Sequence, residues 1–295
     1  MVRGFGKKLC FGATWIVLSL SVSLAAAEPV RVMTFNIRYG TADDGPDRWE
    51  LRREMLLGVV KDFDPDLLGV QEALRDQLDV LAEALPGHVC VGVGREADGG
   101  GEYSALFYRR SRFDLAAADT VWLSDTPDAP GSRSWGNQLP RICTWAQLLD
   151  RTDSRRFTFF NTHWDHQSQP ARERSGQVMA TLVAERTAAG EPALVTGDYN
   201  AGEDNAAIAN LTRSGELLRD TFRVVHADEQ TVGTFNGFQG RTDGPKIDAV
   251  FVTPEWQVVE ADIVRTQESD RYPSDHFPVT ATVELKPAEA SAAAR

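Results

Sequence analysis

The segment Tyr272-Pro-Ser-Asp-His-Phe-Pro-Val279 leads into an alternating apolar and polar run that ends at Leu285. Alternation at a period of two is typical of a half-buried β-strand. Proline and serine are ordinary turn residues, but a turn does not require an acid beside a base, as in Asp275-His276. We therefore ask which residues stand at the ends of the other predicted strands.

Strand-like and helix-like segments alternate along the chain. Helices are predicted where apolar residues recur three and four positions apart, and Asp64-Pro65 and Pro86-Gly87 end two of them. The irregular order of hairpins and crossovers predicts an α/β fold rather than a regular β-α alternation. The predicted strands are 30–36, 67–71, 88–93, 103–109, 141–148, 157–162, 193–196, 247–252 and 279–285, and the predicted helices are 49–63, 74–85 and 171–186.

The first 27 residues are typical of a secretory signal peptide. Three basic residues precede a short apolar run, and Ala25-Ala-Ala27 supplies small residues for cleavage. The apolar run is too short and too rich in serine for a transmembrane helix. We expect residues 1–27 to be removed on export to the periplasm or beyond, residues 28–286 to form one domain, and residues 287–295 to be a disordered tail.

The chain is acidic. Its formal net charge is −12, and loss of the three positive charges in residues 1–27, which contain no acid, leaves −15. A protein with this charge has no general attraction for nucleic acids or anionic membranes. Any binding of phosphate must therefore depend on local groups or on a metal ion.

Two cysteines, Cys90 and Cys143, remain beyond residue 27. Both lie in apolar segments, which predicts buried free thiols because an uncharged thiol behaves as a small apolar group. A single disulfide is the alternative, since export would place the chain in an oxidising compartment.

Polar groups recur at the ends of the predicted strands. In α/β folds, ligands bind in the crevice that strand ends and their loops form, so these groups are candidates for one common site. They are Asn36, Glu72, His163, Asp198 with Asn200, Asp248, and Asp275-His276.

Each group alone has an ordinary structural explanation. Asn36 suits the end of a strand, the acid Glu72 suits the start of a helix, and a lone His163 suits a satisfied buried histidine. The stretch Gly197-Asp-Tyr-Asn200 is good turn chemistry. Asp248 is harder to explain because it lies in an apolar strand, where an unpaired carboxylate is costly. These separate explanations do not account for the joint occurrence.

One chemical explanation covers the metal-binding part of the set. A hard cation such as Mg²⁺ needs oxygen ligands and keeps most of its waters, so one or two carboxylates suffice. Glu72, assisted by Asn36, fits that requirement. Oxygen ligands suit Mg²⁺, Mn²⁺ and Ca²⁺ alike, so the residue types do not choose the ion.

The remaining groups suit the hydrolysis of a phosphate ester. His163 and Asn200 can stabilise the negative charge that gathers on the phosphate oxygens, and Asp198 can activate or orient a water. A buried Asp248 can fix the tautomer of His276 or raise its pKa.

Six short motifs, in this order along the chain, resemble the endonuclease/exonuclease/phosphatase superfamily. The resemblance spans nearly all of residues 28–286 and implies a catalytic domain there. It also implies a four-layer α/β sandwich, in which two mixed β-sheets pack face to face with helices outside. The motifs are Val32-Met-Thr-Phe-Asn-Ile37, Asp66-Leu-Leu-Gly-Val-Gln-Glu72, Asn161-Thr-His163, Thr196-Gly-Asp-Tyr-Asn-Ala201, Lys246-Ile-Asp248 and Ser274-Asp-His-Phe-Pro278.

The resemblance also implies roles for the matched residues. Asp248 would orient His276, and Glu102, matched by a shorter stretch, would pair with His163. By implied role, the metal ligands are Glu72, Asn36 and Asp275, and the catalytic residues are His163, Asp198, Asn200, Asp248, His276 and Glu102.

Further stretches resemble a bacterial branch of the superfamily, exported or cytosolic, with poorly defined substrates. Within them, His166 and Arg172 flank the site in sequence, and Asn36 is a third candidate for substrate binding. His166 and Arg172 either lie in a solvated loop and helix start without a binding role, or they bind a second phosphate or another anion. Members of this branch often have His at the position of Asn236, so it stays open whether this chain makes the corresponding substrate contact.

Together, these observations predict an exported Mg²⁺-dependent phosphoesterase, for which Mn²⁺ could replace Mg²⁺. The enzyme would hydrolyse a phosphodiester or phosphomonoester by direct attack of water. The acidic charge favours a small or lipid-derived substrate. We expect a monomer without stable membrane insertion.

Two alternatives remain. A nuclease acting on DNA or RNA should present a positive groove, and the best local cluster is Arg38, Arg48, Arg52 and Arg53. A non-catalytic binding protein on the same fold would have lost one of the site residues, yet all of them are present.

Overall fold

The computed structural model describes Met1 and residues 28–287. The expected signal peptide and the tail beyond Pro287 lie outside the described residues, so both stay predictions. The strands are β1 (Val30–Asn36), β2 (Leu67–Ala73), β3 (His88–Val91), β4 (Tyr103–Arg109), β5 (Phe113–Trp122), β6 (Ile142–Asp150), β7 (Arg156–His163), β8 (Ala193–Asp198), β9 (Arg219–Asp220), β10 (Asp248–Val252), β11 (Trp256–Ile263) and β12 (Val279–Leu285). The helices are η1 (Gly45–Asp47), α1 (Trp49–Phe63), α2 (Arg75–Ala84), α3 (Gln169–Ala188), α4 (Ala206–Thr212) and α5 (Thr221–Val225).

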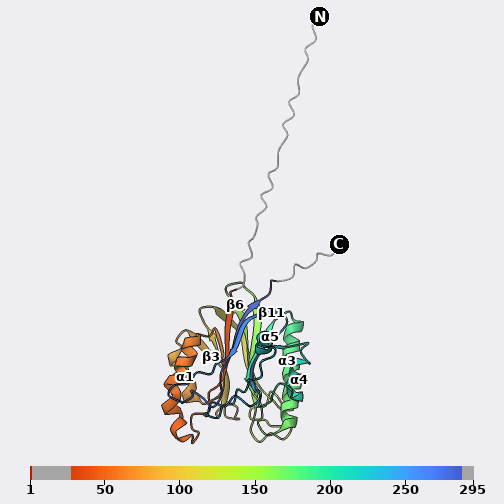
Figure 1. Cartoon of the computed structure of the whole chain (residues 1–295). Coiled ribbons are helices and arrows are strands. Elements are labelled where there is room, and N and C mark those ends of the chain that lie inside the picture. Colours follow the sequence, from red (N-terminus) through yellow and green to blue (C-terminus); the bar gives the residue numbers. More distant parts are fainter. Residues whose placement is uncertain (2–27, 288–295) are drawn as a thin grey trace.

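Two six-stranded sheets lie face to face between outer helices (Figure 1). The first has the order β11-β12-β1-β2-β4-β3 and the second β5-β6-β7-β8-β10-β9. Each is mixed, because β1 and β2 pair in parallel, as do β7 and β8, whereas their other neighbours are antiparallel. The four-layer α/β sandwich that the resemblance implied is confirmed.

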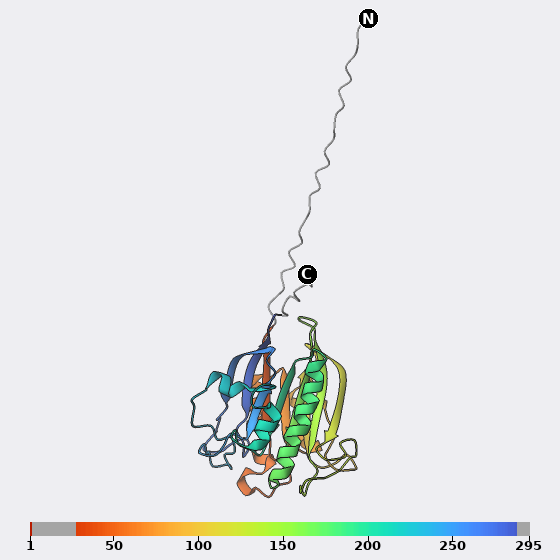
Figure 2. The same ribbon diagram turned by 90° about the vertical axis from the view of Figure 1, so that its right-hand side faces the viewer.

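Apolar residues fill the space between the sheets and beneath the helices. Between the sheets, the Phe157 ring meets Phe113 and Trp256 edge to face, with ring centroids 5.6 and 5.3 Å apart. Outside the second sheet, α3 runs along the strands (Figure 2) and buries Met179 and Val183. Helices α1 and α2 cover the first sheet in the same way. The two sheets therefore form a rigid frame whose strand ends can position a site.

The periodicity predicted most elements, and the helix at 49–63 and the strand at 103–109 have the predicted bounds. The strands β5, β9 and β11 and the short helices η1, α4 and α5 were not predicted. The three strands lie at sheet edges, and β5 is exposed at six consecutive residues, Asp114 to Asp119. An edge strand needs little apolar sequence because it packs against few neighbours, so its pairing with β6, β10 or β12 supplies the order.

The cysteine prediction is half right. Cys143 and Cys90 are both free thiols, and Cys143 is buried as expected. Cys90 is exposed on the edge strand β3, so the prediction of a buried thiol there is wrong.

No helix among the described residues is both long enough and apolar enough to cross a membrane.

One buried amide links the two sheets. Asn161 on β7 donates from Nδ2 to the main-chain carbonyls of Val70 on β2 (2.8 Å) and Ala105 on β4 (2.9 Å). Its Oδ1 accepts hydrogen bonds from Gln71 (2.6 Å) and Thr196 (3.0 Å). The side chain thus satisfies four groups in the interior and fixes the position of β7 relative to β2.

We expect Asn161→Ala to lower the free energy of unfolding by about 3 kcal/mol, because two carbonyls and two donors would lose their buried partner. Asn210→Ala, which removes one amide contact at 3.2 Å on α4, should cost less than about 1 kcal/mol. Urea denaturation measures both values. Equal stabilities of the two variants would contradict the linking role of Asn161.

Candidate active site

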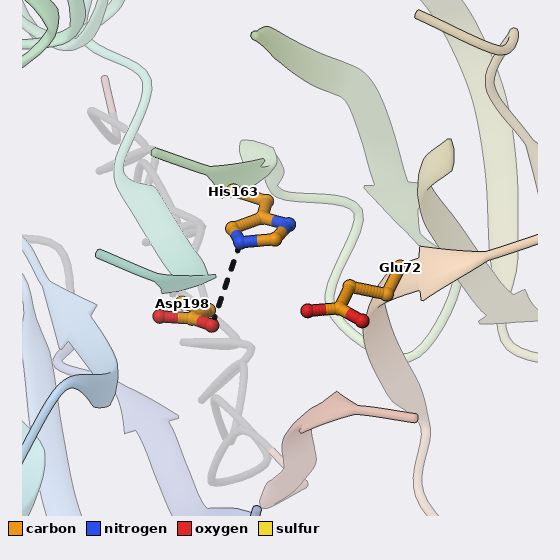
Figure 3. A group of neighbouring side chains, drawn as sticks. All are labelled: Glu72, His163 and Asp198. Carbon is orange, nitrogen blue, oxygen red and sulfur yellow. Dashed lines mark ion pairs between the residues drawn. The ribbon is translucent and has the colours of Figure 1, made fainter. Parts of the chain in front are cut away.

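The strand-end residues converge at one end of the sandwich. Glu72 at the end of β2 points from the first sheet toward His163 and Asp198, which end β7 and β8 of the second (Figure 3). Asp248 begins β10 and the Asp275-His276 pair precedes β12, so both reach the same end. The sequence pattern therefore corresponds to one cluster in space.

Asn36 connects the two halves of this cluster. Its Nδ2 donates to Asp198 Oδ2 at 2.8 Å and to Glu72 Oε1 at 3.1 Å, and its side chain is fully buried. One amide thus joins a carboxylate of the first sheet to a carboxylate of the second. Ser274 Oγ donates to the Asn36 carbonyl (2.7 Å) and ties the Asp275-His276 turn to the same strand end.

The Glu72 carboxylate owes its direction to a distortion of β2. The pairing of β2 with β4 is irregular between Val70 and Ala73, and Glu72 has a φ of +61°. A non-glycine residue in this left-handed region is strained by roughly 1 kcal/mol, and bulges of this kind re-aim side chains. The carboxylate then accepts from the Tyr39 N–H at 3.2 Å.

The environment of His163 favours a neutral imidazole. Burial, followed by the positive charges of Arg141 and Arg95, holds its pKa well below the ordinary value. Its Nε2 lies 3.0 Å from Asn200 Nδ2, so Nε2 accepts the hydrogen bond and the proton resides on Nδ1. Glu102 lies 3.9 Å from Nδ1 and is instead bound to Arg95 at 2.6 Å.

His276 has the opposite character. Its Nδ1 lies 2.8 Å from Asp248 Oδ2. Burial lowers its pKa, but the nearby Asp248 and Asp198 carboxylates outweigh burial and hold the pKa well above the ordinary value. Nε2 is consequently left to face Asp198, 3.8 Å away.

Asp198 titrates near neutrality. Burial, followed by repulsion from Asp248, raises its pKa to about 7, although His276 and the hydrogen bonds from Asn200 and Asn36 act against the rise. A carboxylate with this pKa can both take and return a proton at physiological pH.

The residues present fit a divalent cation. Glu72, His163 and Asp198 offer ligand atoms that lie within 4.8 Å of one another, and Asp198, Asp248 and His276 form a second such group. The first group suits a metal better because the Asp248–His276 hydrogen bond occupies two members of the second. Its carboxylate oxygens are the ligands that Mg²⁺ and Mn²⁺ prefer. Asp275 lies 3.8 Å from Arg38 at the edge of the cluster.

The predicted basic cluster is divided by the fold. Arg52 is fully buried and donates to four main-chain carbonyls, including those of Ile37 and Pro273, so it supports the site loops. Arg48 and Arg53 are exposed beside Glu50 and Glu54. These arginines therefore do not line one common positive groove for nucleic acid.

The flanking candidates also differ from one another. Arg172 donates to Gln169 Oε1 and to the Asp165 carbonyl (2.9 Å), so its guanidinium is already hydrogen-bonded to groups at the start of its own helix. His166 is exposed and accepts from Arg141. Asn236 is fully buried and donates to the Ser274 carbonyl at 3.1 Å, so it supports the turn instead of facing a substrate.

Sequence reasoning did not single out Arg141 or Arg95 as site residues. Arg141 directly precedes β6 and follows residues 124–140, a long connection that is rich in proline, glycine and serine, and Arg95 follows β3. The length of that connection was the only signal, because loops longer than about 12–15 residues are often functional.

We expect Asp248→Asn to lower the pKa of His276, since the substitution removes the charge that holds the ring cationic. The imidazole Cε1–H resonance in NMR titration of the metal-free protein measures it. Because the folded-state pKa is raised, the stabilisation from His276 is present below its unfolded pKa of about 6.5 and is lost as pH rises through the folded value. The exposed Asp228→Asn is the control, and an unchanged His276 pKa in Asp248→Asn would contradict the assignment.

Comparisons with known proteins agree with this geometry. The model of the Endonuclease/Exonuclease/phosphatase family matches residues 33–276. An endonuclease/exonuclease/phosphatase family protein from Bacteroides thetaiotaomicron is 32% identical, with a TM-score of 0.80 over 89% of this chain and 100% of that one. A mannosyl-6-phosphatase from Bacteroides thetaiotaomicron is also 32% identical, with a TM-score of 0.78 over 87% and 100%.

Among curated proteins, nocturnin of Rattus norvegicus is 26% identical over 282 residues, which cover 85% of this chain. The match covers 63% of nocturnin itself, so this chain spans less than two thirds of that relative. Family model, sequence and structure thus agree, and the chain belongs to the endonuclease/exonuclease/phosphatase family.

Proposed function

We propose that this protein is a divalent-metal-dependent phosphoesterase that cleaves a P–O bond by direct attack of water. The observation that carries the proposal is the meeting of Glu72 with His163, Asp198 and His276 across two sheets. The ligand atoms of Glu72, His163 and Asp198 lie within 4.8 Å of one another, and His276 Nε2 lies 3.8 Å from Asp198. An acid, a base and a candidate cation site are thus combined, as phosphate ester hydrolysis requires.

Glu72 and Asp198 would hold the metal, for which Mg²⁺ is our proposal and Mn²⁺ the substitute. When bound, such an ion offsets negative charge on a phosphate and lowers the pKa of a water. Arg38 lies 4.0 Å from Glu72 and 3.8 Å from Asp275, and it offsets part of the negative charge of these carboxylates.

The side chains divide the remaining work. Asp198, through the carboxylate oxygen that does not bind the metal, would accept the proton of the attacking water. His276 is held cationic and would donate from Nε2 to a phosphate oxygen, while Asp248 accepts from Nδ1 and fixes the orientation of the ring. Asn200 positions the neutral ring of His163, because its amide donates to His163 Nε2 and to the Trp164 carbonyl, each at 3.0 Å. Preorganised donors of this kind stabilise charge that develops in the transition state.

A small phosphate ester is the substrate class we favour. The net charge of −12 works against general binding of phosphate polymers, and the 32% identity to a mannosyl-6-phosphatase favours a sugar phosphate. A nuclease is the second candidate, since an acidic protein can still attract phosphate locally through its metal.

Glu72→Gln should reduce metal-dependent turnover of p-nitrophenyl phosphate and bis-p-nitrophenyl phosphate by at least about 100-fold, because it removes a ligand charge at the metal. Release of p-nitrophenol with Mg²⁺, Mn²⁺ or chelator measures it, and the exposed Glu83→Gln should retain wild-type turnover. Full activity of Glu72→Gln would sink the metal assignment. Folded wild type that binds phosphate without turnover would favour the binding-protein alternative.

Export to the periplasm or beyond is part of the proposal and rests on the basic start and apolar run of residues 1–27. Expressed in a Gram-negative host, the protein should appear in the periplasmic fraction with Glu28 as its first residue. Intact-mass and N-terminal sequencing measure this. A cytoplasmic chain that still begins at Met1 would contradict it.

A further inference from the structure

One arginine at the edge of the candidate active site has a donor that is free and open to solvent. Arg38 lies in the loop that follows β1, and its side chain is 26% exposed. Its Nε and Nη2 donate to the Asp44 carboxylate at 3.0 and 2.8 Å. Its Nη1 has no hydrogen-bond partner among residues 28–287 and is not one of the buried polar atoms. A ligand in the site can therefore reach this nitrogen.

The free donor faces the proposed metal side of the site. Nη1 of Arg38 lies 4.0 Å from Glu72 Oε2, and Nε lies 3.8 Å from Asp275 Oδ2. Both distances are too long for hydrogen bonds, so the two carboxylates attract the guanidinium without occupying its donors. A phosphate group bound beside Glu72 would lie next to Nη1 and would accept a charge-assisted hydrogen bond from it.

The main chain fixes the direction of this side chain. Arg38 has a φ of +54°, a left-handed conformation that is strained for residues other than glycine. Its N–H donates to Asn36 Oδ1 at 3.0 Å, and its carbonyl accepts from Arg52 Nη2 and Gln77 Nε2, each at 2.9 Å. Strained residues that their surroundings hold in place are concentrated at functional sites. The guanidinium is thus directed at the site before a ligand arrives.

A fixed guanidinium distinguishes phosphate groups by their charge and by their free oxygens. A phosphomonoester has three free oxygens and about two negative charges near neutral pH, whereas a phosphodiester has two free oxygens and one charge. One oxygen would lie at the metal and one at His276 Nε2. Arg38 Nη1 is then the donor for the third oxygen, which a diester lacks.

We propose that Arg38 is a specificity-determining residue, which binds the third free oxygen of a phosphomonoester and makes the site prefer monoesters to diesters. The inference rests on the proposed function and narrows its substrate class from small phosphate esters to phosphomonoesters. Asp44 positions the guanidinium, as does the Tyr39 ring, whose centroid lies 4.7 Å from the guanidinium carbon.

Two probes without a hydrolysable bond test this role. Phenylphosphonate has the three free oxygens of a monoester, and methylphenylphosphinate carries a methyl group in place of the third. Isothermal titration calorimetry at saturating Mg²⁺, above the second pKa of the phosphonate, gives both dissociation constants. The wild type should bind phenylphosphonate at least about tenfold more tightly than the phosphinate. Arg38→Gln should reduce this ratio at least about fivefold, while its affinity for the phosphinate changes less than about twofold.

Turnover gives a second measurement of the same preference. Arg38→Gln should lower kcat/KM for p-nitrophenyl phosphate at least about 30-fold and for bis-p-nitrophenyl phosphate less than about threefold. A purely structural role of Arg38 would instead reduce both values alike.

Matched variants separate binding from folding. Arg53→Gln removes a nearby arginine whose side chain is 48% exposed beside Glu54, and it should keep the wild-type ratio. If circular dichroism shows that Arg38→Gln is unfolded, Arg38→Lys takes its place. A lysine keeps the charge but has no second nitrogen to reach the phosphonate while the first binds Asp44, so the ratio should fall at least about threefold.

Equal binding of the two probes by the wild type, binding of neither, an unchanged ratio in Arg38→Gln, or an equal loss of affinity for both probes would overturn the role of Arg38. Failure of the proposed function has a different signature, which is absence of Mg²⁺-supported turnover of either p-nitrophenyl ester by the folded wild type. A calorimetric preference that depends on Arg38, without turnover, would keep the specificity role and refute the phosphoesterase.

Discussion

Hydrogen bonds across the sandwich hold the candidate site together. Asn161 binds two carbonyls of the opposite sheet, and Asn36 joins the Glu72 and Asp198 carboxylates. The sheets approach so closely beside Asn161 that a Cβ on Gly69 would lie 2.2 Å from Thr196 Oγ1. Since no larger residue fits there, the spacing of the sheets is fixed, and the ends of β2, β7 and β8 meet in one arrangement.

This frame gives two histidines opposite charges within one site. His163 lies near Arg141 and Arg95, which with burial lower its pKa, whereas Asp248 and Asp198 raise the pKa of His276. His276 can therefore donate a hydrogen bond as a charged imidazolium, whereas His163 remains neutral. A pair of environments that push pKa values apart is how one fold assigns different roles to the same residue type.

The sequence predicted the elements that have a strong local pattern and the residues that end them. Glu72, Asp198 and His276 converge because they stand at strand ends on one edge of the sandwich. Local patterns predicted the strand ends, whereas the sandwich that brings them together was implied only by the resemblance. The bulge that aims Glu72, the pairing of β5 and the inter-sheet contacts of Asn161 have no local signal, because neighbouring strands determine them. The position of Arg141 beside His163 likewise follows from the fold and has no local signal.

The central claim is that carboxylates from two sheets create one divalent-metal site. The most direct measurement is a crystal grown with Mn²⁺ and analysed for anomalous scattering. The account predicts one strong peak in contact with the Glu72 carboxylate and close to Asp198, which disappears in Glu72→Gln crystals grown in the same way. A site without a peak at Glu72, or a peak that persists in the variant, would contradict the account.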